Sequence, residues 1–375
     1  MGSDVLALVS WDPIPRELVE VYNTRYPDLM VNLYALSPDE LKSLMKDLKQ
    51  PSFRAKQLHK WLYVRGAQSF AEMTDLPKSL RSQLENTCRL GDLEISTEQH
   101  SQDGTKKRLY RLEDGKLIES VLMEYTDGRR TACISSQAGC AMGCTFCATG
   151  QMGFARHLTD TEIFEQAGRF AAELAARNER LSNVVLMGMG EPFHNYDATL
   201  RAVRRLMRDL GIGARHITIS TVGLVPQIRR FSQEGLQVRL AISLHASTDA
   251  TRSTMLPINR RWPVAELIEA CHEYHQNTGR RVTFEWALIT DENDSTQEAH
   301  QLGALLKGLI CHVNLIPLNP TGGYAGTPTS PEKANAFVKT LSGYGIPATI
   351  RVRRGIDIDA GCGQLKSTAL KKQQR

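Results

Sequence analysis

The chain has 375 residues, 41% of them hydrophobic and 23% charged, which is enough to bury the core of a large domain and a smaller one. Its eight cysteines are too few over this length for a secreted disulfide scaffold, and their clustering indicates a metal site in a reducing compartment. The net charge of +5 is weak evidence for a nucleic-acid partner, because many soluble enzymes share it.

The sequence shows no sign of a membrane segment or a targeting signal. No uninterrupted apolar run approaches the length that crosses a bilayer. The N-terminal residues lack the basic stretch of a signal peptide, and Leu6 stands where a myristoylation signal needs Ser or Thr. We therefore expect a soluble cytoplasmic protein.

The first third of the chain is expected to hold an N-terminal extension, residues 1–35, to which no role is assigned, and a helical domain, residues 36–97. A capping box over Ser37–Glu40 predicts one helix, and apolar spacing predicts a second over 53–65. The stretch from Lys49 to Arg65 contains no acidic residue. Basic side chains beside aromatic ones suit a phosphate backbone, but an ordinary solvated helix face explains them equally well.

The rest of the chain, apart from a basic tail over residues 366–375, has the pattern of an α/β enzyme. A hairpin is predicted around Glu113–Gly115. Because the later strand candidates alternate with amphipathic helices, we expect parallel βαβ units in an open or closed barrel. One of these helices is predicted to open at a capping box over Thr159–Glu162. These candidates cover residues 131–136, 183–187, 216–219, 238–243, 282–288, 312–317 and 347–352.

Three cysteines in eight residues form the most informative motif of the chain. Cys140, Cys144 and Cys147 have the spacing C-x3-C-x2-C, which suits an iron–sulfur cluster held by thiolates. A structural zinc site needs four ligands, and no fourth Cys or His lies at tight spacing nearby. Three cysteines on a four-iron cluster leave one iron open to bind a substrate or cofactor.

Polar or glycine-rich segments follow five of the predicted strands. In parallel barrels active sites gather at the C-terminal ends of the strands, so these segments and the cysteine motif predict one cofactor pocket. Besides the cysteine motif after the first strand, the segments are Met187–Pro192, Ser220–Gly223, Ser243–His245 and Asn319–Pro320.

Two further cysteines do not look like core residues. Cys133 lies inside the first predicted barrel strand, seven residues before the cluster motif. Cys362 lies between two glycines in a stretch too rich in Gly and Asp for packing. The remaining three, Cys88, Cys271 and Cys311, are interpreted as core filler.

These motifs closely resemble the RlmN family of radical S-adenosylmethionine (SAM) RNA methyltransferases, sisters of the Cfr resistance methyltransferases. The resemblance runs from about residue 36 to residue 365, with small departures at Ile356 and Gly361. It rests on Phe53–Gln57 with Trp61, Gln137–Cys140 with Cys144 and Cys147, Gly188–Pro192, Ser243–His245, Asn314–Pro317 with Asn319, and Asp357–Leu365.

The resemblance implies the fold, the cofactors and the site residues. The fold is α/β: a radical SAM partial (β/α)6 barrel over residues 98–365, with a small all-helical, RNA-binding accessory domain over residues 36–97. A [4Fe–4S] cluster is held by Cys140, Cys144 and Cys147, and two SAM molecules are used in each turnover. The SAM site is lined by Gly190, Glu191, Ser220, Ser243, Leu244, His245 and Asn319.

The resemblance also implies a reaction at adenine C2. Cys362 accepts a methyl group, Glu119 acts as general base, and Cys133 resolves a transient protein–RNA adduct, leaving a disulfide. The product is 2-methyladenosine in 23S rRNA at the peptidyl transferase centre and in tRNA beside the anticodon. The implied partners are these RNAs and an electron donor such as flavodoxin or ferredoxin, with the enzyme a monomer.

Three alternatives remain open from the sequence. A Cfr-type enzyme methylates C8 of the same rRNA adenosine with the same five cysteines; the accessory domain and Asp357–Asp359 favour C2. A radical SAM enzyme for a small molecule leaves the basic N-terminal helices and the Cys133–Cys362 pair unexplained. A non-enzymatic iron–sulfur RNA-binding protein leaves the segments of the SAM pocket unexplained.

Overall fold

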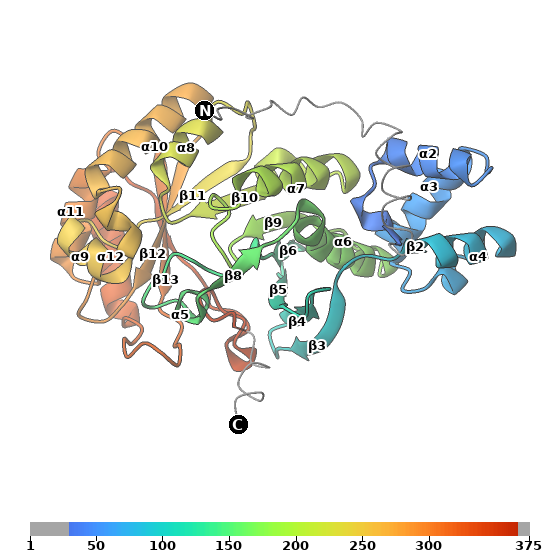
Figure 1. The fold of residues 1–375 in the computed structure, drawn as a ribbon. Helices are drawn as coiled ribbons and strands as arrows, with labels where there is room; N and C mark the ends of the chain where they lie inside the picture. Colours follow the sequence, from blue (N-terminus) through green and yellow to red (C-terminus); the bar gives the residue numbers. More distant parts are fainter. Residues whose placement is uncertain (1–29, 367–375) are drawn as a thin grey trace, which may run out of the picture.

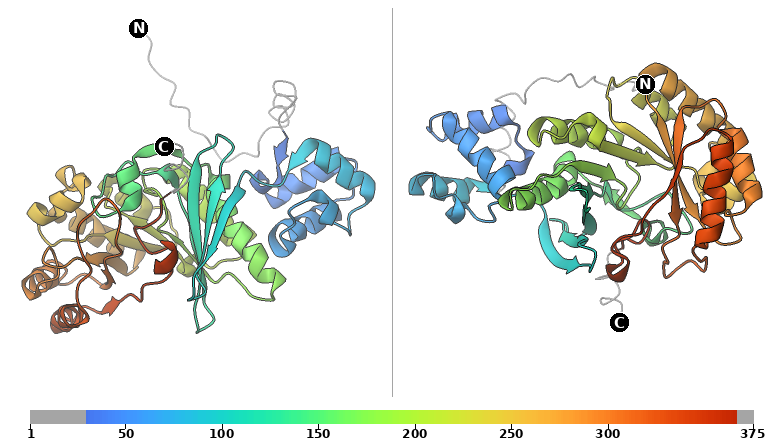
Figure 2. Two further views of the ribbon diagram at one scale, coloured as in Figure 1. Left: turned by 90° about the horizontal axis from the view of Figure 1, so that it is seen from below. Right: turned by 180° about the vertical axis from the view of Figure 1, so that it is seen from behind.

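The computed structural model of the chain describes residues 30–366, shown from three directions in Figures 1 and 2. A small, mostly helical domain, blue in Figure 1, stands beside a larger domain in which helices cover a sheet. Most of the predicted extension, residues 1–29, and the tail beyond Lys366 lie outside the described residues.

The large domain is built on one sheet of ten strands in the order β14-β13-β12-β11-β10-β9-β6-β5-β4-β3. Neighbours from β14 to β6 run parallel, and β5, β4 and β3 continue antiparallel. The end strands β14 and β3 do not pair, so the barrel is partial, as expected. The parallel strands are β6 (Arg130–Cys133), β9 (Asn183–Leu186), β10 (Ile217–Thr221), β11 (Arg239–Ser243), β12 (Val282–Leu288), β13 (Cys311–Pro317) and β14 (Ala348–Ile350).

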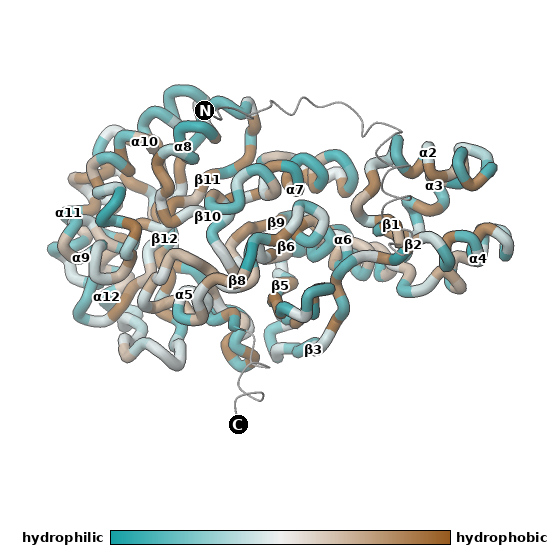
Figure 3. Tube along the Cα trace, in the orientation of Figure 1, coloured by the Kyte–Doolittle hydropathy of each residue, from teal (hydrophilic) through white to brown (hydrophobic). Residues whose placement is uncertain are grey.

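Helices connect the parallel strands and cover the outer side of the curved sheet (Figure 1). Hydrophobic residues follow the strands, while helices such as α7 carry hydrophilic residues on their outward side (Figure 3). Phe337 of α12 packs against Trp286 of β12 with ring centroids 5.7 Å apart, and both are buried. The helices are α6 (Asp160–Ala176), α7 (Tyr196–Asp209), α8 (Val225–Ser232), α9 (Asp249–Met255), α10 (Val264–Thr278), α11 (Thr296–Leu305) and α12 (Pro331–Gly343).

All seven predicted barrel strands are present, because apolar runs of this length favour strands buried in a parallel sheet. Only β14, at the edge, has no fully buried residue. The predicted hairpin is formed by β4 (Lys106–Arg111) and β5 (Leu117–Glu124). β3 (Glu94–His100) begins inside the range expected to belong to the helical domain, yet it pairs with β4. Residues 94–97 therefore belong by their pairing to the large sheet.

The accessory domain is helical apart from one short pair of strands. Its helices are α2 (Pro38–Asp47), α3 (Phe53–Lys60) and α4 (Lys78–Thr87), and the Ser37–Glu40 capping box is present. A π-helical turn over Trp61–Arg65 continues α3 and ends at Gly66, which has a positive φ. β1 (Val31–Asn32) pairs in parallel with β2 (Cys88–Arg89), so the domain starts before residue 36 and is not entirely helical.

Buried aromatic contacts fasten the accessory domain to α6 of the barrel. The ring of Tyr63 lies 5.6 Å from that of Phe164, and Tyr34 packs edge-on against Tyr63. The guanidinium of Arg205, on α7, stacks on Phe164 at 4.1 Å and donates to the Tyr34 carbonyl. The two domains therefore share a hydrophobic core.

No helix in the described part of the chain is long and apolar enough to span a bilayer.

Candidate active site

The three clustered cysteines lie in the loop of a small hairpin that the sequence did not predict. The hairpin is formed by β7 (Gln137–Gly139) and β8 (Phe154–His157), with the short helix α5 (Ala148–Met152) inside the loop. The Cys140 N–H donates to the Gly153 carbonyl at 2.8 Å. A Cβ on Gly139, which has φ +76°, would lie 2.0 Å from the same carbonyl oxygen, so this position requires glycine.

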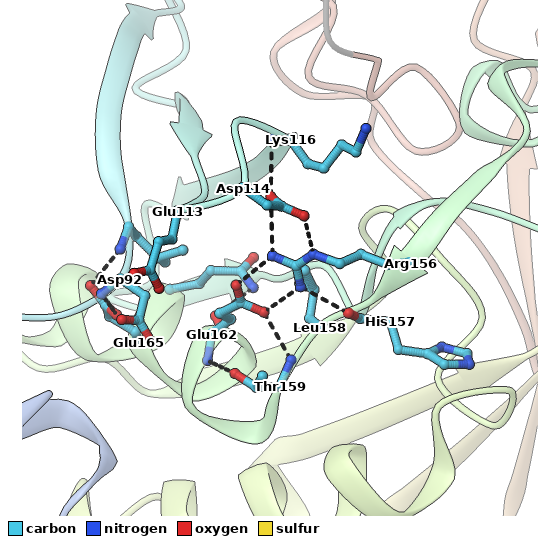
Figure 4. A network of polar contacts seen from close by, with 12 residues as sticks. Asp92, Glu113, Asp114, Lys116, Arg156, His157, Leu158, Thr159, Glu162 and Glu165 are labelled. Carbon is cyan, nitrogen blue, oxygen red and sulfur yellow. Dashed lines mark hydrogen bonds and ion pairs between the residues drawn. The ribbon is translucent and has the colours of Figure 1, made fainter. Parts of the chain in front are cut away.

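Arg156 on β8 ties the hairpin to two other elements of the barrel (Figure 4). Its guanidinium bonds to Asp114, in the turn between β4 and β5, at 2.6 Å, and to Glu162 of α6 at 2.7 Å. Glu162 also accepts from the Thr159 N–H at 2.9 Å, which completes the predicted capping box. The cluster loop thus has a rigid base.

The three thiols of the loop suit a cluster, in which each thiolate binds an iron of its own. Burial raises the pKa of the Cys140 thiol to about 12. Burial, followed by the nearby Cys147 and Cys140 thiols, raises that of Cys144 still further. Among residues 30–366, no three His, Cys, Asp or Glu side chains are close enough to share one metal ion. Buried thiolates need cationic partners, and a four-iron cluster provides a separate iron for each.

A cavity with about 950 Å³ of empty space, partly open to solvent, begins beside the cluster loop. Its walls come from the segments that follow the parallel strands, as the barrel pattern predicts. Six of the seven residues expected at the SAM site line it: Gly190, Glu191, Ser220, Ser243, His245 and Asn319.

Leu244 is the exception, because its side chain is fully buried in the hydrophobic core. Ser243 and His245 line the cavity, while the side chain of Leu244 between them packs into the core. Only the backbone of Leu244 is left to contact SAM, and its place at the SAM site stays a prediction.

His245 presents a hydrogen-bond donor to the cavity. Its Nδ1 accepts from the Ala287 N–H at 2.8 Å, so the neutral ring carries its proton on Nε2. Burial, and after it the charge of nearby Arg252, lowers the pKa of this imidazole to about 3. The ring also stacks edge-on against Phe146 of the cluster loop, with centroids 4.9 Å apart. His245 therefore stays neutral at physiological pH.

Glu191 and Asn319 differ in whether the protein satisfies their oxygen atoms. The Glu191 carboxylate accepts the N–H groups of Phe193 and Val222 at 3.0 and 2.8 Å, and burial raises its pKa to about 7. The Asn319 amide donates to the Cys362 carbonyl at 3.0 Å, while its buried Oδ1 has no partner in the described chain. This unsatisfied acceptor suits a ligand that donates a hydrogen bond.

Cys362 lines this cavity and also a second one, with about 540 Å³ of empty space. The second cavity is lined by Cys133, Val121, Met123 and Arg351 as well. Cys362 therefore faces both the cluster side and Cys133. All eight cysteines are free thiols, so the expected disulfide is not present in this structure.

The segment that carries Cys362 is fastened to the cluster loop. The Ala148 N–H donates to the Gly363 carbonyl at 2.8 Å, and the Thr149 hydroxyl donates to the Leu365 carbonyl at 2.7 Å. The final segment of the described chain thus closes the site from one side, which no local sequence pattern revealed.

Glu119 lies on β5 on the same face as Val121 and Met123 of the second cavity, because alternate residues share a face. It does not line either cavity, since Lys107 Nζ lies 3.3 Å from Oε1 and the Lys366 N–H donates to Oε2 at 2.8 Å. Burial raises its pKa to about 6, against the opposing charge of Lys107.

Arg252 supports the wall of the cavity, and the sequence did not single it out. It is fully buried and donates to the Leu244 carbonyl at 3.1 Å and the Val222 carbonyl at 2.6 Å. It thereby joins the segments after β10 and β11 that form the cavity wall. No sequence signal distinguishes it from the many surface arginines of the helices.

The two basic surfaces considered for RNA differ in their charge pairing. Lys56 and Lys60 on α3 are exposed and form no ion pair with any residue from 30 to 366, whereas Arg54 bonds to Gln57 and the Asp75 carbonyl. On the alternative surface, on α7, Arg205 is buried between the two domains. The other three arginines there are neutralised by ion pairs: Arg201, Arg204 and Arg208.

Comparison with known proteins agrees with this geometry. Residues 134–302 match the model of the radical SAM superfamily, and residues 31–90 match that of the ribosomal RNA large subunit methyltransferase N-terminal domain. A dual-specificity RNA methyltransferase RlmN 1 from Myxococcus xanthus is 50% identical over 93% of this chain and 98% of its own length. The chain belongs to the RlmN family of radical SAM RNA methyltransferases.

Two further proteins are similar to this chain over nearly the same residues. A probable dual-specificity RNA methyltransferase RlmN from Symbiobacterium thermophilum is 49% identical over 91% of this chain and 92% of its own length. The crystal structure of a radical SAM methyltransferase from Sphaerobacter thermophilus superposes with a TM-score of 0.85, at 49% identity over 90% of this chain and 99% of that one. The family implies a [4Fe–4S] cluster and SAM as cofactors.

Proposed function

We propose that this radical SAM enzyme makes 2-methyladenosine in 23S rRNA at the peptidyl transferase centre and in tRNA at the adenosine beside the anticodon. The observation that carries the proposal is the position of Cys362, which lines both the cavity at the cluster loop and the cavity shared with Cys133. A thiol that must meet SAM, RNA and a second thiol in turn needs access to both.

The target carbon explains why two thiols are needed. C2 of adenine has no lone pair to attack a methyl sulfonium, so direct transfer from SAM fails. The thiolate of Cys362 is a good nucleophile and takes the methyl group by displacement. Cys140, Cys144 and Cys147 would hold the cluster, which would supply the electron that cleaves a second SAM to the radical that abstracts hydrogen from this methyl group.

The chain's own residues complete the reaction. The resulting Cys362 thiomethylene radical adds to C2, which links protein and RNA. Glu119 removes the C2 proton, and the adduct gives up its unpaired electron, which the oxidised cluster would accept. Cys133 then attacks the Cys362 sulfur, releases the methylated base and leaves a disulfide, which a reductant opens before the next turnover. Residues 140–147 hold the cluster, and Gly190, Glu191, Ser220, Ser243, His245 and Asn319 form the SAM cavity.

The remaining parts of the proposal concern the partners. The accessory domain contributes RNA contacts through the exposed Lys56 and Lys60, and the electron donor is a small redox protein such as flavodoxin or ferredoxin. A cytoplasmic monomer remains the prediction made from the sequence.

Replacement of single cysteines tests the order of events. In Cys133→Ala, methyl loading and radical addition proceed, so a covalent protein–RNA complex accumulates as a gel band that ribonuclease trims. In Cys362→Ala neither methyl transfer nor the RNA link appears. Cys271→Ala is the matched control: it lies in the core of α10, costs on the order of 1 kcal/mol of stability, and turns over normally.

Two results would contradict the proposal. Normal turnover of Cys133→Ala, or an RNA link in Cys362→Ala, excludes the two-thiol mechanism. Mass spectrometry of nucleosides from wild-type reactions decides the position, since 8-methyladenosine in place of 2-methyladenosine identifies a Cfr-type enzyme.

A further inference from the structure

Arg351 lies beside the two mechanistic thiols, yet nothing so far gives it a role. It follows β14, and its backbone N–H donates to the Leu315 carbonyl at 2.8 Å, which fixes the start of its side chain. The side chain lines the second cavity with Cys133 and Cys362. Within residues 30–366 its guanidinium forms no ion pair and no hydrogen bond.

The neighbouring arginine shows what a structural role would look like. Arg354, three residues on, donates to the carbonyls of Asp103 and Glu124 at 3.1 and 3.0 Å and stacks on Tyr125 at 4.4 Å. Arg351 lines the second cavity and has no such partners in the described chain, so its N–H donors are available to a group in that cavity. A cation held there without partners points to an anion that is formed during the reaction.

The charged groups around Arg351 come from four elements. They are Glu285 on β12, Cys133 on β6, Cys362 on the final segment, and Tyr125 after β5. Glu285 is buried and accepts from the Asn314 amide at 2.7 Å. Arg351 is the cation that opposes the burial-raised pKa of both the Cys362 and the Cys133 thiols, and the Cys147 thiol of the cluster loop faces Cys362 as well.

We propose that Arg351 is a positioning residue that pairs in turn with the Cys362 and Cys133 thiolates, while Glu285 balances its charge between these steps. The proposal rests on the proposed function, because only the two-thiol reaction requires both sulfurs as anions.

Both steps balance with this arrangement. In the first, the Cys362 thiolate forms a bond to the SAM methyl carbon, the sulfonium–methyl bond breaks, and neutral S-adenosylhomocysteine leaves; nothing is oxidised or reduced. In the second, the Cys133 thiolate forms a bond to Cys362 Sγ, the Sγ–carbon bond breaks, and its electron pair stays on the product carbon, which takes up a proton. Each step begins with an anion beside Arg351 and ends without it.

Alkylation by iodoacetamide without RNA tests the proposal directly, because this reagent reacts with thiolates. The cluster-loaded protein is alkylated from pH 6 to 10, and the rates at Cys362 and Cys133 are read by peptide mass spectrometry. We expect Arg351→Gln to slow both rates on the order of tenfold at pH 7, with convergence at high pH. Arg351→Lys keeps the charge and restores most of the rate.

Arg215→Gln is the matched control, since it removes the same charge from an exposed position that lines neither cavity. It leaves both alkylation rates within twofold of wild type. Thermal melting and iron content show that each variant is folded and loaded. Methyl loading of Cys362 from labelled SAM, also without RNA, falls in Arg351→Gln in proportion to the alkylation rate.

The outcomes separate this inference from the proposed function. Unchanged alkylation in Arg351→Gln overturns the inference, and if RNA affinity falls instead, Arg351 is a phosphate contact. If alkylation depends on Arg351 but the wild-type enzyme never loads methyl on Cys362, the pairing stands and the proposed function fails.

Discussion

At the residue scale, Glu119 shows how burial raises the pKa of a carboxyl group, so that it can act as a base near neutral pH. Burial raises its pKa to about 6, so the group is ionised above this pH and protonated below it. A base must be deprotonated, so single-turnover product formation is expected to fall as the pH drops through about 6. Glu119→Gln should lose this dependence and roughly 10²-fold to 10⁴-fold in rate.

The control for this prediction is Glu113→Gln, an exposed carboxyl in the turn that leads into the same strand. It should keep the wild-type rate and pH profile. Rapid-quench measurement of methylated RNA from pH 5 to 8 distinguishes the variants. A full rate in Glu119→Gln would remove Glu119 from the reaction.

The sequence predicted residues whose chemistry is visible in their type and spacing. Cys140 and Cys362 were found because clustered or glycine-flanked thiols are unusual, whereas Cys133 was found through the family resemblance. Arg252 and Arg351 were not found, because an arginine becomes distinctive only when the fold buries it or leaves it without a partner. The burial of the Leu244 side chain could not be foreseen, because a motif match does not say which side of the chain a side chain faces.

At the scale of elements, the β7–β8 hairpin determines whether the cluster can be held. Gly139→Ala should lose the cluster, because a Cβ would lie 2.0 Å from the Gly153 carbonyl, which accepts the Cys140 N–H. Gly128→Ala is the matched control: it also has a positive φ, +84°, but its Cβ meets open space. It should cost only the strain of that conformation, about 1–2 kcal/mol.

Iron content per protein and the melting temperature check this prediction. We expect Gly128→Ala to keep its iron with a slightly lower melting temperature, while Gly139→Ala loses most of its iron. Equal iron in the two variants would mean that the hairpin tolerates a shifted carbonyl.

Long helices and strands were predicted from the sequence, whereas the shortest strands were not. The barrel strands and the capped helices α2 and α6 were predicted, because apolar runs and capping boxes are local signals. β7 and β8 have three and four residues and are polar or glycine-containing, so they depend on the cluster loop for their pairing. β1 and β2 have two residues each, too few for a periodic pattern.

At the scale of the whole molecule, the sequence predicted two domains and a partial barrel but not how the parts meet. The antiparallel extension of the sheet by β5, β4 and β3 brings Glu119 beside the segment that carries Cys362. This contact joins residues that are 247 positions apart in the sequence, so no local sequence pattern could predict it. The site is therefore a product of the tertiary fold.

The same arrangement places the accessory domain at one end of the molecule and α11 and α12 at the other (Figure 1). If the accessory domain binds the RNA backbone, Lys56→Glu with Lys60→Glu removes two phosphate contacts from its exposed face. Each contact contributes about 0.7 to 0.9 to the slope of log affinity against log salt, so the slope should become shallower by roughly 1.5.

Lys307→Glu with Lys339→Glu makes the same change in net charge at the far end, on exposed positions beside α11 and on α12. Fluorescence anisotropy with labelled RNA between 50 and 200 mM salt gives the slope for each variant, at about the range where such losses are large. A net-charge effect would lower both slopes equally, because long-range attraction depends on total charge. A contact effect makes the slope shallower only in the Lys56 and Lys60 variant. A slope equal to that of wild type in this variant would place the RNA on another surface.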